Sequence, residues 1–300
     1  MTTRVIAVGG ADAAAARLAA CLGGTVCPLA QRRFPDGEHY LRVLGAVEGA
    51  DVVLVAHLHP VDPLLVDIVF LADALRELGA RQVGLVVPYL AYMRQDRRFQ
   101  PGEAVTSVSF ARLLSRSVDW LATVDPHLHR HAALSAIYSV PALAVPSAPA
   151  IARWIRAEVP DAVVVGPDEE SGQWVDEVAR LAGCPGITGR KLRHGDRSVE
   201  ITWPALQPWR GRPAVLVDDI VSSGQTLVTA LQGLGAQGLQ AAACVVVHGL
   251  FEQDAAQRLQ AAGASRLVVC NTLPQPGLPL IDVLGDLAEA AARLIAPRQG

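Results

Sequence analysis

One stretch of the chain decides how the rest should fold: Ala214-Val215-Leu216-Val217-Asp218-Asp219-Ile220-Val221-Ser222-Ser223-Gly224-Gln225-Thr226. Four apolar residues lead directly into two carboxylates, and a loop of small, hydroxyl-bearing residues follows. A short apolar run of this kind is typical of a strand buried on both faces of a parallel sheet. Parallel sheets bind ligands outside the carboxyl ends of their strands, which is where Asp218 and Asp219 are expected.

The same strand pattern recurs along the whole chain. Further apolar runs occupy residues 52–55, 83–87, 162–165 and 245–247. Helix-length stretches lie between them, at 63–79, 105–117, 171–183, 225–235 and 252–263, and several end at a glycine. This alternation predicts an α/β fold in which helices cover both faces of mostly parallel sheets.

The length of 300 residues is about twice that of a usual domain, so two domains are expected. Pro141, Pro146 and Pro149 interrupt the alternation near the middle of the chain. We therefore predict a first domain at 1–146 and a second at 147–300, with similar strand and helix content.

The composition of the chain indicates a globular protein and argues against several kinds of partner. Hydrophobic residues make up 51% and charged residues 18% of the chain, which predicts a soluble globular protein. The net charge of −3 gives no general attraction to nucleic acid or to an anionic membrane, and we expect neither as a partner. Five scattered cysteines without a Cys-x-x-Cys pair fit a reducing cytoplasm, and the first residues have too short an apolar run for a secretory signal.

The loop after Asp219 has the chemistry of a phosphate site. Ser222, Ser223 and Thr226 supply hydroxyls, Gly224 leaves the backbone unhindered, and the next helix begins with free amides. An ordinary turn with a serine helix cap would look similar. Two adjacent carboxylates favour a ligand, because they repel each other unless cations or hydroxyls engage them.

Two other segments carry candidate binding residues. Arg94 and Gln95 follow a buried run and could present a guanidinium group to a polyphosphate, although a solvated surface loop would have the same composition. Phe34, Asp36 and Glu38 alternate, so in an extended segment they would point one way and could contact an adenine ring and its ribose. The simpler alternative is an edge strand with solvated charges.

Histidines and basic residues form the remaining candidates. His127, His129 and His131 alternate, and on a strand they could form a zinc site. Lys191 and Arg193 lie in a polar, glycine-punctuated stretch at 189–197, which predicts a mobile loop. Such a loop could close over a substrate and stabilise charge on a transferring phosphoryl group, or it could be a solvated basic hairpin.

Residues 214–226 resemble the phosphoribosyl-diphosphate-binding motif shared by phosphoribosyltransferases and ribose-phosphate diphosphokinases. The diphosphokinase family is favoured because further motifs resemble it in order and spacing over nearly the whole chain. These motifs are at 34–38, 88–97, 123–127, 165–168, 189–193, 248–251 and 271–275. Ordinary transferases lack the first three.

This resemblance implies two similar domains of the type I phosphoribosyltransferase-like fold. It also implies a magnesium-dependent reaction in which the diphosphoryl group of ATP passes to ribose 5-phosphate, giving 5-phosphoribosyl 1-diphosphate and AMP. The first domain would contribute the ATP site and the second would bind ribose 5-phosphate. A homo-oligomer, with the ATP site completed by a neighbouring subunit, is a further implication.

Residue roles follow by matching motifs. The implied ribose 5-phosphate ligands are Asp218, Asp219, Ser222, Ser223, Gly224, Gln225 and Thr226. The implied ATP ligands are Phe34, Asp36, Glu38, Arg94 and Gln95. Lys191 and Arg193 would be catalytic, and His127 and Asp168 would hold Mg²⁺.

The match has departures, and other functions remain open. Glu169-Glu170-Ser171 stands where the family commonly has small residues, and Ser222 stands where many members have aspartate. One alternative is a catalytically silent paralogue that binds the same ligands and regulates a partner enzyme. Another is a phosphoribosyltransferase, which the ATP-site motifs disfavour.

Overall fold

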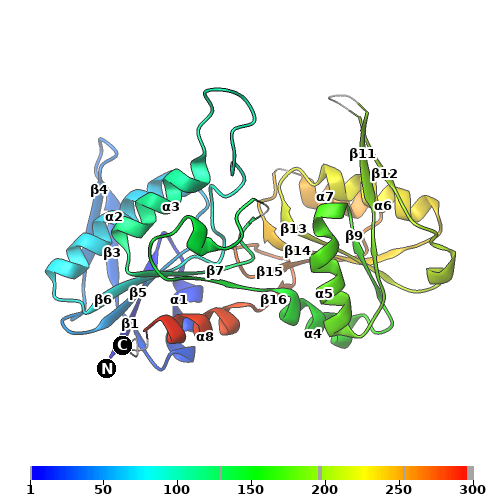
Figure 1. Cartoon of the computed structure of the whole chain (residues 1–300). Coiled ribbons are helices and arrows are strands. Elements are labelled where there is room, and N and C mark those ends of the chain that lie inside the picture. Colours follow the sequence, from blue (N-terminus) through cyan, green and yellow to red (C-terminus); the bar gives the residue numbers. More distant parts are fainter. Residues whose placement is uncertain (1, 129, 195–197, 253, 296–300) are drawn as a thin grey trace. The chain divides into compact units, whose positions relative to one another are not determined.

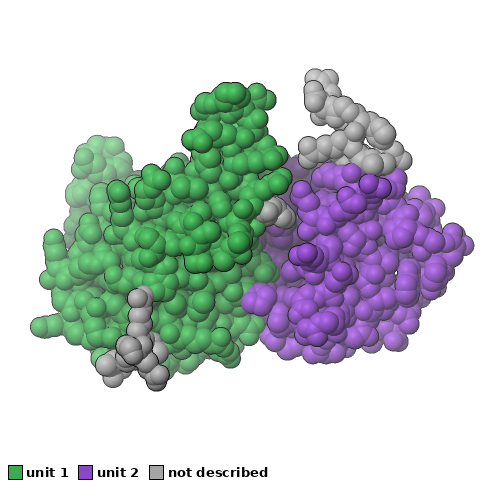
Figure 2. Space-filling model, viewed as in Figure 1, with its two compact units in different colours: residues 1–145, 284–300 green, residues 146–283 purple. Residues whose placement is uncertain are grey.

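The chain folds into two compact units in a computed structural model that describes residues 2–128, 130–194, 198–252 and 254–295 (Figure 2). The first unit comprises Met1–Val145 and the segment that begins at Leu284, and the second comprises Pro146–Val283. The chain thus leaves the first unit next to the predicted boundary. The predicted second domain, however, included the C-terminal helix, which packs with the first unit.

The first unit is built on a six-stranded sheet in which all neighbouring strands are parallel (Figure 1). The strand order is β2 (Thr25–Val26), β1 (Thr3–Val8), β5 (Asp51–Ala56), β6 (Gln82–Val86), β7 (Trp120–Val124) and β8 (Ala142–Val145). Helices α2 (Val61–Glu77) and α3 (Thr106–Ser117) pack together, as do α1 (Asp12–Cys21) and α8 (Leu284–Ile295). Every residue of β5 is buried, as the apolar run at 52–55 predicted.

The return of α8 to the first unit has a simple cause. Its buried face of Leu284, Leu287, Ala288 and Ala291 contacts β6, β7 and β8. An amphipathic helix must bury its apolar stripe, but that stripe does not encode which of two similar sheets it covers.

An antiparallel hairpin, β3 (Leu29–Arg33) and β4 (His39–Val43), accompanies the first sheet. Its register pairs Arg33 with His39, so residues 34–38 form the connecting turn. A 3₁₀ turn, η1 (Leu134–Ala136), precedes β8.

The second unit repeats the architecture with its own six-stranded parallel sheet. The strand order is β10 (Gly186–Thr188), β9 (Val163–Gly166), β13 (Ala214–Val221), β14 (Ala241–Gly249), β15 (Leu267–Cys270) and β16 (Leu280–Ile281). Helices α4 (Ala148–Glu158) and α5 (Gly172–Ala182) pack together, as do α6 (Gln225–Ala236) and α7 (Ala255–Ala261). Two 3₁₀ turns, η2 (Glu169–Ser171) and η3 (Gln207–Trp209), complete the unit. The predicted class of two similar α/β units with parallel sheets is therefore confirmed.

The polar stretch that was predicted as a mobile loop, with a basic hairpin as the alternative, forms a two-stranded antiparallel ribbon. Strand β11 (Arg190–His194) pairs antiparallel with β12 (Ser198–Thr202), and Lys191 lies opposite Ile201. Strand β11 lacks an apolar alternation because most of its residues are polar or charged, so periodicity could not identify it.

No helix in the described ranges is long and apolar enough to cross a membrane.

Candidate functional site

The acidic pair lies within the central strand of the second sheet. Strand β13 continues past Val217 to Val221, because Ile220 and Val221 pair with His248 and Gly249 of β14. The prediction that the strand ends before Asp218 was therefore wrong by four residues. Since β13 lies between β9 and β14, both carboxylates lie at the middle of the sheet near its carboxyl edge.

The carboxyl group of Asp218 has a strongly raised pKa. Burial is the main reason that its pKa lies well above the usual value of 3.8, and the nearby carboxylates of Asp219 and Asp168 raise it further. The backbone N–H of Asp219, 3.1 Å from Asp218 Oδ1, and the charge of Lys191 act in the opposite direction and lower this pKa. The site therefore has more carboxylates than neighbouring positive charge can balance. It would favour binding of a cation or of hydroxyl groups that donate hydrogen bonds.

Asp168 begins the turn after β9. Its carboxylate accepts a hydrogen bond from the backbone N–H of Ser171 at 3.3 Å, and the Ser171 hydroxyl donates to the Asp168 carbonyl at 2.6 Å. These two bonds cap η2 and hold Asp168 at the carboxyl edge of the sheet.

Lys191 connects three segments that are distant in sequence. Its ammonium nitrogen lies 4.0 Å from Asp168 Oδ2 and 3.5 Å from Thr226 Oγ1. Only about a quarter of the side chain is exposed. The ribbon therefore carries its lysine to the carboxyl edge of the sheet, where β9, β13 and α6 converge.

Arg193 is placed by its backbone alone. It lies two residues after Lys191 on β11 and is paired with Val199 of β12 in the register of the ribbon. Its side chain lies outside the described part of the chain.

Residues 222–226 form a tight loop that leads into α6. Gly224 has φ of +73° and precedes the helix, a left-handed conformation that glycine adopts without penalty. The Ser223 hydroxyl accepts from the backbone N–H of Gln225 at 3.5 Å, and the Ser222 carbonyl accepts from Glu252 N–H at 3.1 Å. The loop thus presents hydroxyls and the N-terminus of a 12-residue helix, a combination that favours anions.

The aromatic and acidic residues at 34–38 occupy the turn of the β3–β4 hairpin, whose strands are labelled in Figure 1. The Asp36 carboxylate accepts a hydrogen bond from the Glu38 backbone N–H at 3.1 Å, and the Phe34 backbone N–H donates to the Glu38 carbonyl at 2.8 Å. The assumption of an extended segment was wrong, so alternation does not align these side chains. Phe34 remains 38% exposed and packs edge-on against Tyr40, with ring centroids 6.0 Å apart.

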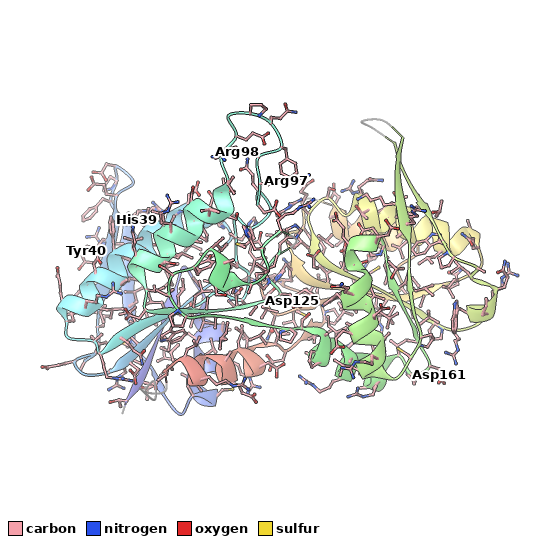
Figure 3. All side chains as sticks on the ribbon, viewed as in Figure 1. His39, Tyr40, Arg97, Arg98, Asp125 and Asp161 are labelled. Carbon is pink, nitrogen blue, oxygen red and sulfur yellow. The ribbon has the colours of Figure 1, made fainter. Side chains whose placement is uncertain are left out.

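Arg94 and Gln95 lie in the long loop between β6 and α3, the loop that also carries Arg97 and Arg98 (Figure 3). Arg94 is exposed, whereas Gln95 is half-buried and its carbonyl accepts from Ser107 N–H at 3.3 Å at the start of α3. Earlier in the loop, Tyr92 donates to Asp62 at 2.5 Å, and this bond is the main cause of the raised pKa of the tyrosine.

The histidine segment after β7 is irregular, so the strand needed for a three-histidine zinc site is absent from its described residues. His129 lies outside the described residues, and His131 contacts the Ser107 hydroxyl at 3.1 Å. His127 follows Asp125, a non-glycine residue with φ of +30° at the carboxyl end of β7. His127 and Asp168 belong to different units, and each follows a strand of its own sheet.

The donor set of the second unit suits magnesium better than a transition metal. Among the described residues, no three His, Cys, Asp or Glu side chains are grouped closely enough to hold a metal ion by themselves. Mg²⁺ prefers oxygen ligands and is commonly bound by one or two carboxylates together with substrate phosphates. Asp168, Asp218 and Asp219 supply carboxylates of this kind.

Two residues of this site were not identified from the sequence. Ser171 follows Asp168 by three residues, an Asp-x-x-Ser spacing that could have indicated a capped turn. Arg258 of α7 donates a hydrogen bond to the Ser223 carbonyl, 35 residues earlier in the chain. No sequence pattern around either residue predicts that contact.

Comparison with known proteins agrees with the family resemblance found in the sequence. Residues 3–117 match the N-terminal domain of ribose phosphate pyrophosphokinase, and residues 135–271 match a phosphoribosyl transferase domain. The ribose-phosphate pyrophosphokinase of Methanopyrus kandleri is 38% identical over 280 residues, which cover 93% of this chain and 94% of that protein. The chain belongs to the ribose-phosphate pyrophosphokinase family. The resemblance found in the sequence is thereby confirmed.

Other members of the ribose-phosphate pyrophosphokinase family agree over similar lengths. The protein of Sulfolobus acidocaldarius is 32% identical and covers 93% of this chain. The crystal structure of phosphoribosylpyrophosphate synthetase from Mycobacterium smegmatis superposes with a TM-score of 0.83, 25% identity and 98% coverage of both chains. The family fold therefore extends across both units.

Proposed function

We propose that this chain is an active ribose-phosphate pyrophosphokinase that converts ATP and ribose 5-phosphate to 5-phosphoribosyl 1-diphosphate and AMP. The observation that carries the proposal is the position of Lys191, between Asp168 and the Thr226 hydroxyl and close enough to Asp218 to lower its pKa. Relatives of the same family name that match most of the chain support it.

The reaction forms one bond and breaks one. The anomeric hydroxyl oxygen of ribose 5-phosphate bonds to the β-phosphorus of ATP, the bond from that phosphorus to the α–β bridging oxygen breaks, and AMP leaves. The hydroxyl proton is released. No covalent enzyme intermediate is needed, so positioning and electrostatics supply most of the rate.

The second unit would hold the sugar. Asp218 and Asp219 would accept hydrogen bonds from the ribose hydroxyls, and residues 222–226 would bind the 5-phosphate. The left-handed Gly224 and the amides that begin α6 support this assignment, because a glycine turn before a helix N-terminus is a combination that favours phosphate binding. Lys191 and Arg193 would stabilise the charge that develops on the transferring phosphoryl oxygens.

The first unit would hold the nucleotide through Phe34, Asp36, Glu38, Arg94 and Gln95. Exposed Phe34 offers an aromatic face for adenine, and exposed Arg94 offers a guanidinium group for phosphate. We further propose that the protein is a homo-oligomer of the cytoplasm and that a neighbouring subunit contributes to this ATP site.

Magnesium would be held by His127 and Asp168, with ATP oxygens as its other ligands. When bound, it would supply charge neutralisation on the phosphate chain. The oxygen-rich donor set around Asp168 supports this choice of ion.

The test is to incubate the purified protein with Mg²⁺, ATP and ribose 5-phosphate and to quantify AMP and 5-phosphoribosyl 1-diphosphate. We expect both products in equal amounts and only when ribose 5-phosphate is present. Formation of ADP in place of AMP would contradict the proposed transfer. Binding of ATP without turnover would instead support the regulatory paralogue, and consumption of phosphoribosyl diphosphate with a nucleobase would support a phosphoribosyltransferase.

A further inference from the structure

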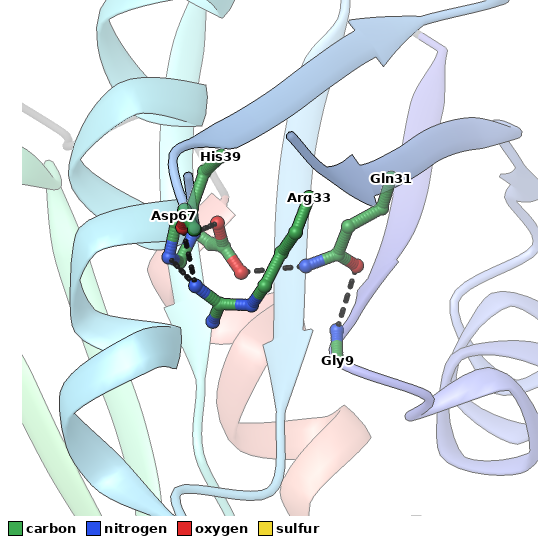
Figure 4. A network of polar contacts seen from close by, with 6 residues as sticks. Gly9, Gln31, Arg33, His39 and Asp67 are labelled. Carbon is green, nitrogen blue, oxygen red and sulfur yellow. Dashed lines mark hydrogen bonds and ion pairs between the residues drawn. The ribbon is translucent and has the colours of Figure 1, made fainter. Parts of the chain in front are cut away.

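A buried carboxylate of the first unit organises a polar network that contains none of the proposed ligand-binding residues (Figure 4). Asp67 lies on the buried face of α2 and its side chain is only 3% exposed. A buried carboxylate is costly unless it is hydrogen-bonded or paired, so its partners should reveal why it is there.

Both oxygens of Asp67 bind residues of the β3–β4 hairpin. Oδ2 accepts from Gln31 Nε2 at 2.5 Å, and Oδ1 accepts from His39 Nδ1. Gln31 in turn accepts from the Gly9 backbone N–H at 3.2 Å through its amide oxygen. One carboxylate of α2 thus connects both strands of the hairpin and, through Gln31, the loop after β1.

The proton positions in this network follow from its donors. Arg33 Nη1 lies 2.5 Å from His39 Nε2, and a guanidinium nitrogen can only donate. His39 Nε2 must therefore be the acceptor, and the ring proton must be on Nδ1, where it is donated to Asp67. The same Arg33 nitrogen donates to the Gly37 carbonyl at 3.0 Å, inside the turn.

Arg33 and His39 are opposite one another in the hairpin and are the residues that flank the 34–38 turn. A two-stranded ribbon is only marginally stable without further support. The network provides that support where the turn begins and ends. We infer that Asp67 and His39 are positioning residues that hold the Phe34–Glu38 turn in the geometry that binds ATP.

This inference rests on the proposed function, because it assumes that the turn contacts the nucleotide. It predicts a selective effect. None of the six residues in the network belongs to the unit that carries Asp218 and Lys191, so loss of the network should weaken ATP binding without altering ribose 5-phosphate binding.

The decisive variant is Asp67→Asn, which preserves the size of the side chain. Its amide N–H₂ group would replace one of the two oxygens that accept from Gln31 and His39, so one of these donors would lose its acceptor. We expect the KM for ATP to rise about tenfold, equivalent to about 1.4 kcal/mol. The KM for ribose 5-phosphate and kcat should stay within about twofold. The matched control is Asp73→Asn on the same helix, whose side chain is 72% exposed and should change none of these values.

A second pair of variants covers the possibility that Asp67→Asn unfolds the unit. His39→Phe removes both ring contacts, whereas His39→Asn can still donate from near the Nδ1 position. The inference expects a larger rise in the KM for ATP for His39→Phe than for His39→Asn, with melting temperatures that remain close to the wild type.

Direct titration of ATP into the same proteins separates this inference from the proposed function. If the wild type binds ATP but forms no AMP, the proposed function fails, and the dissociation constants still decide the role of Asp67. If the wild type is active and all three variants bind ATP as it does, the positioning role is overturned. Equal losses for ATP, ribose 5-phosphate and kcat would also overturn it, since they indicate a general structural defect.

Discussion

The ammonium nitrogen of Lys191 lies 3.5 Å from the hydroxyl of Thr226, although 35 residues separate the two in the chain. The contact joins the β11–β12 ribbon to the first turn of α6. It places the basic residue that would stabilise a transferring group beside the loop that would bind the sugar phosphate. Lys191 also lies 4.0 Å from Asp168, so the ribbon is linked to the turn after β9 as well.

Substitution of Lys191 should separate chemistry from binding. Removal of one preorganised donor to a developing oxyanion typically lowers kcat about 10²–10³-fold, so Lys191→Ala should fall in that range with little change in the KM for ribose 5-phosphate. Rates of AMP release at saturating substrates measure the effect. The adjacent Arg190→Ala is the matched control, because Arg190 is 70% exposed and forms an ion pair at 3.3 Å with the equally exposed Glu169, which solvent screens. A similar loss in both variants would contradict a specific role for Lys191.

The sheet architecture was predictable because it depends on local composition. The apolar runs at 52–55, 83–87, 162–165, 214–217 and 245–247 correspond to β5, β6, β9, β13 and β14, since strands buried on both faces need continuous apolar residues. The helix at 225–235 likewise coincides with α6 to within one residue.

Two strands that were not predicted, β3 and β11, consist mostly of polar or charged residues. Each pairs antiparallel with the strand that follows it, β4 or β12, and apolar periodicity does not reveal this pairing. Asp67 and Lys191 illustrate the limit for the site. The sequence shows an acid on a helix and a base in a polar stretch, but not that they reach His39 and Thr226.

The close packing of Gly189 makes it a sensitive position at the base of the ribbon. A Cβ there would lie 2.7 Å from Ile201 Cγ2 and 2.9 Å from the Pro167 carbonyl oxygen, and the backbone oxygen cannot yield easily. Gly189→Ala should displace the start of β11 and lower kcat about tenfold through Lys191, because small misplacement of reacting groups has large kinetic effects. Steady-state kinetics test this.

A control for this change is Gly172→Ala in the first turn of α5. A Cβ at Gly172 would meet nothing closer than 3.9 Å, so the variant should be active and as stable as the wild type or slightly more stable. If Gly189→Ala retains full kcat, the ribbon does not depend on this close approach.

The loop at residues 222–226, the proposed phosphate site, should be sensitive to backbone conformation at Gly224. A Cβ there would have room, with Leu259 3.6 Å away, but φ of +73° costs an alanine roughly 1–2 kcal/mol. Gly224→Ala should therefore raise the KM for ribose 5-phosphate about tenfold while leaving the KM for ATP within twofold. Gly224→Asn should be less affected, because asparagine tolerates the left-handed region better. A larger effect of asparagine than of alanine would indicate that side-chain volume, and not φ, limits this position.

The raised pKa of Asp218 predicts how stability depends on pH. Burial first, and then Asp219 and Asp168, keep this pKa well above 3.8, so the folded state binds a proton that the unfolded state has already lost. The stability that this proton contributes is present below pH about 4 and is lost as pH rises through the raised pKa. Asp218→Asn cannot ionise and should therefore be more stable than the wild type at pH 8, by roughly 2–4 °C for each kcal/mol relieved.

Thermal unfolding without divalent ions, at pH 4 and pH 8, measures this difference. The advantage of Asp218→Asn should grow with pH, while its activity should fall because Asp218 is a proposed ribose ligand. Glu177→Gln should change the melting temperature at pH 8 in the opposite direction, since hydrogen bonding to Arg180 lowers the pKa of the Glu177 carboxyl. That variant should be slightly less stable than the wild type at pH 8, and only slightly, because solvent screens the exposed pair. A melting-temperature difference for Asp218→Asn that is the same at both pH values would show that the Asp218 pKa is not raised by folding.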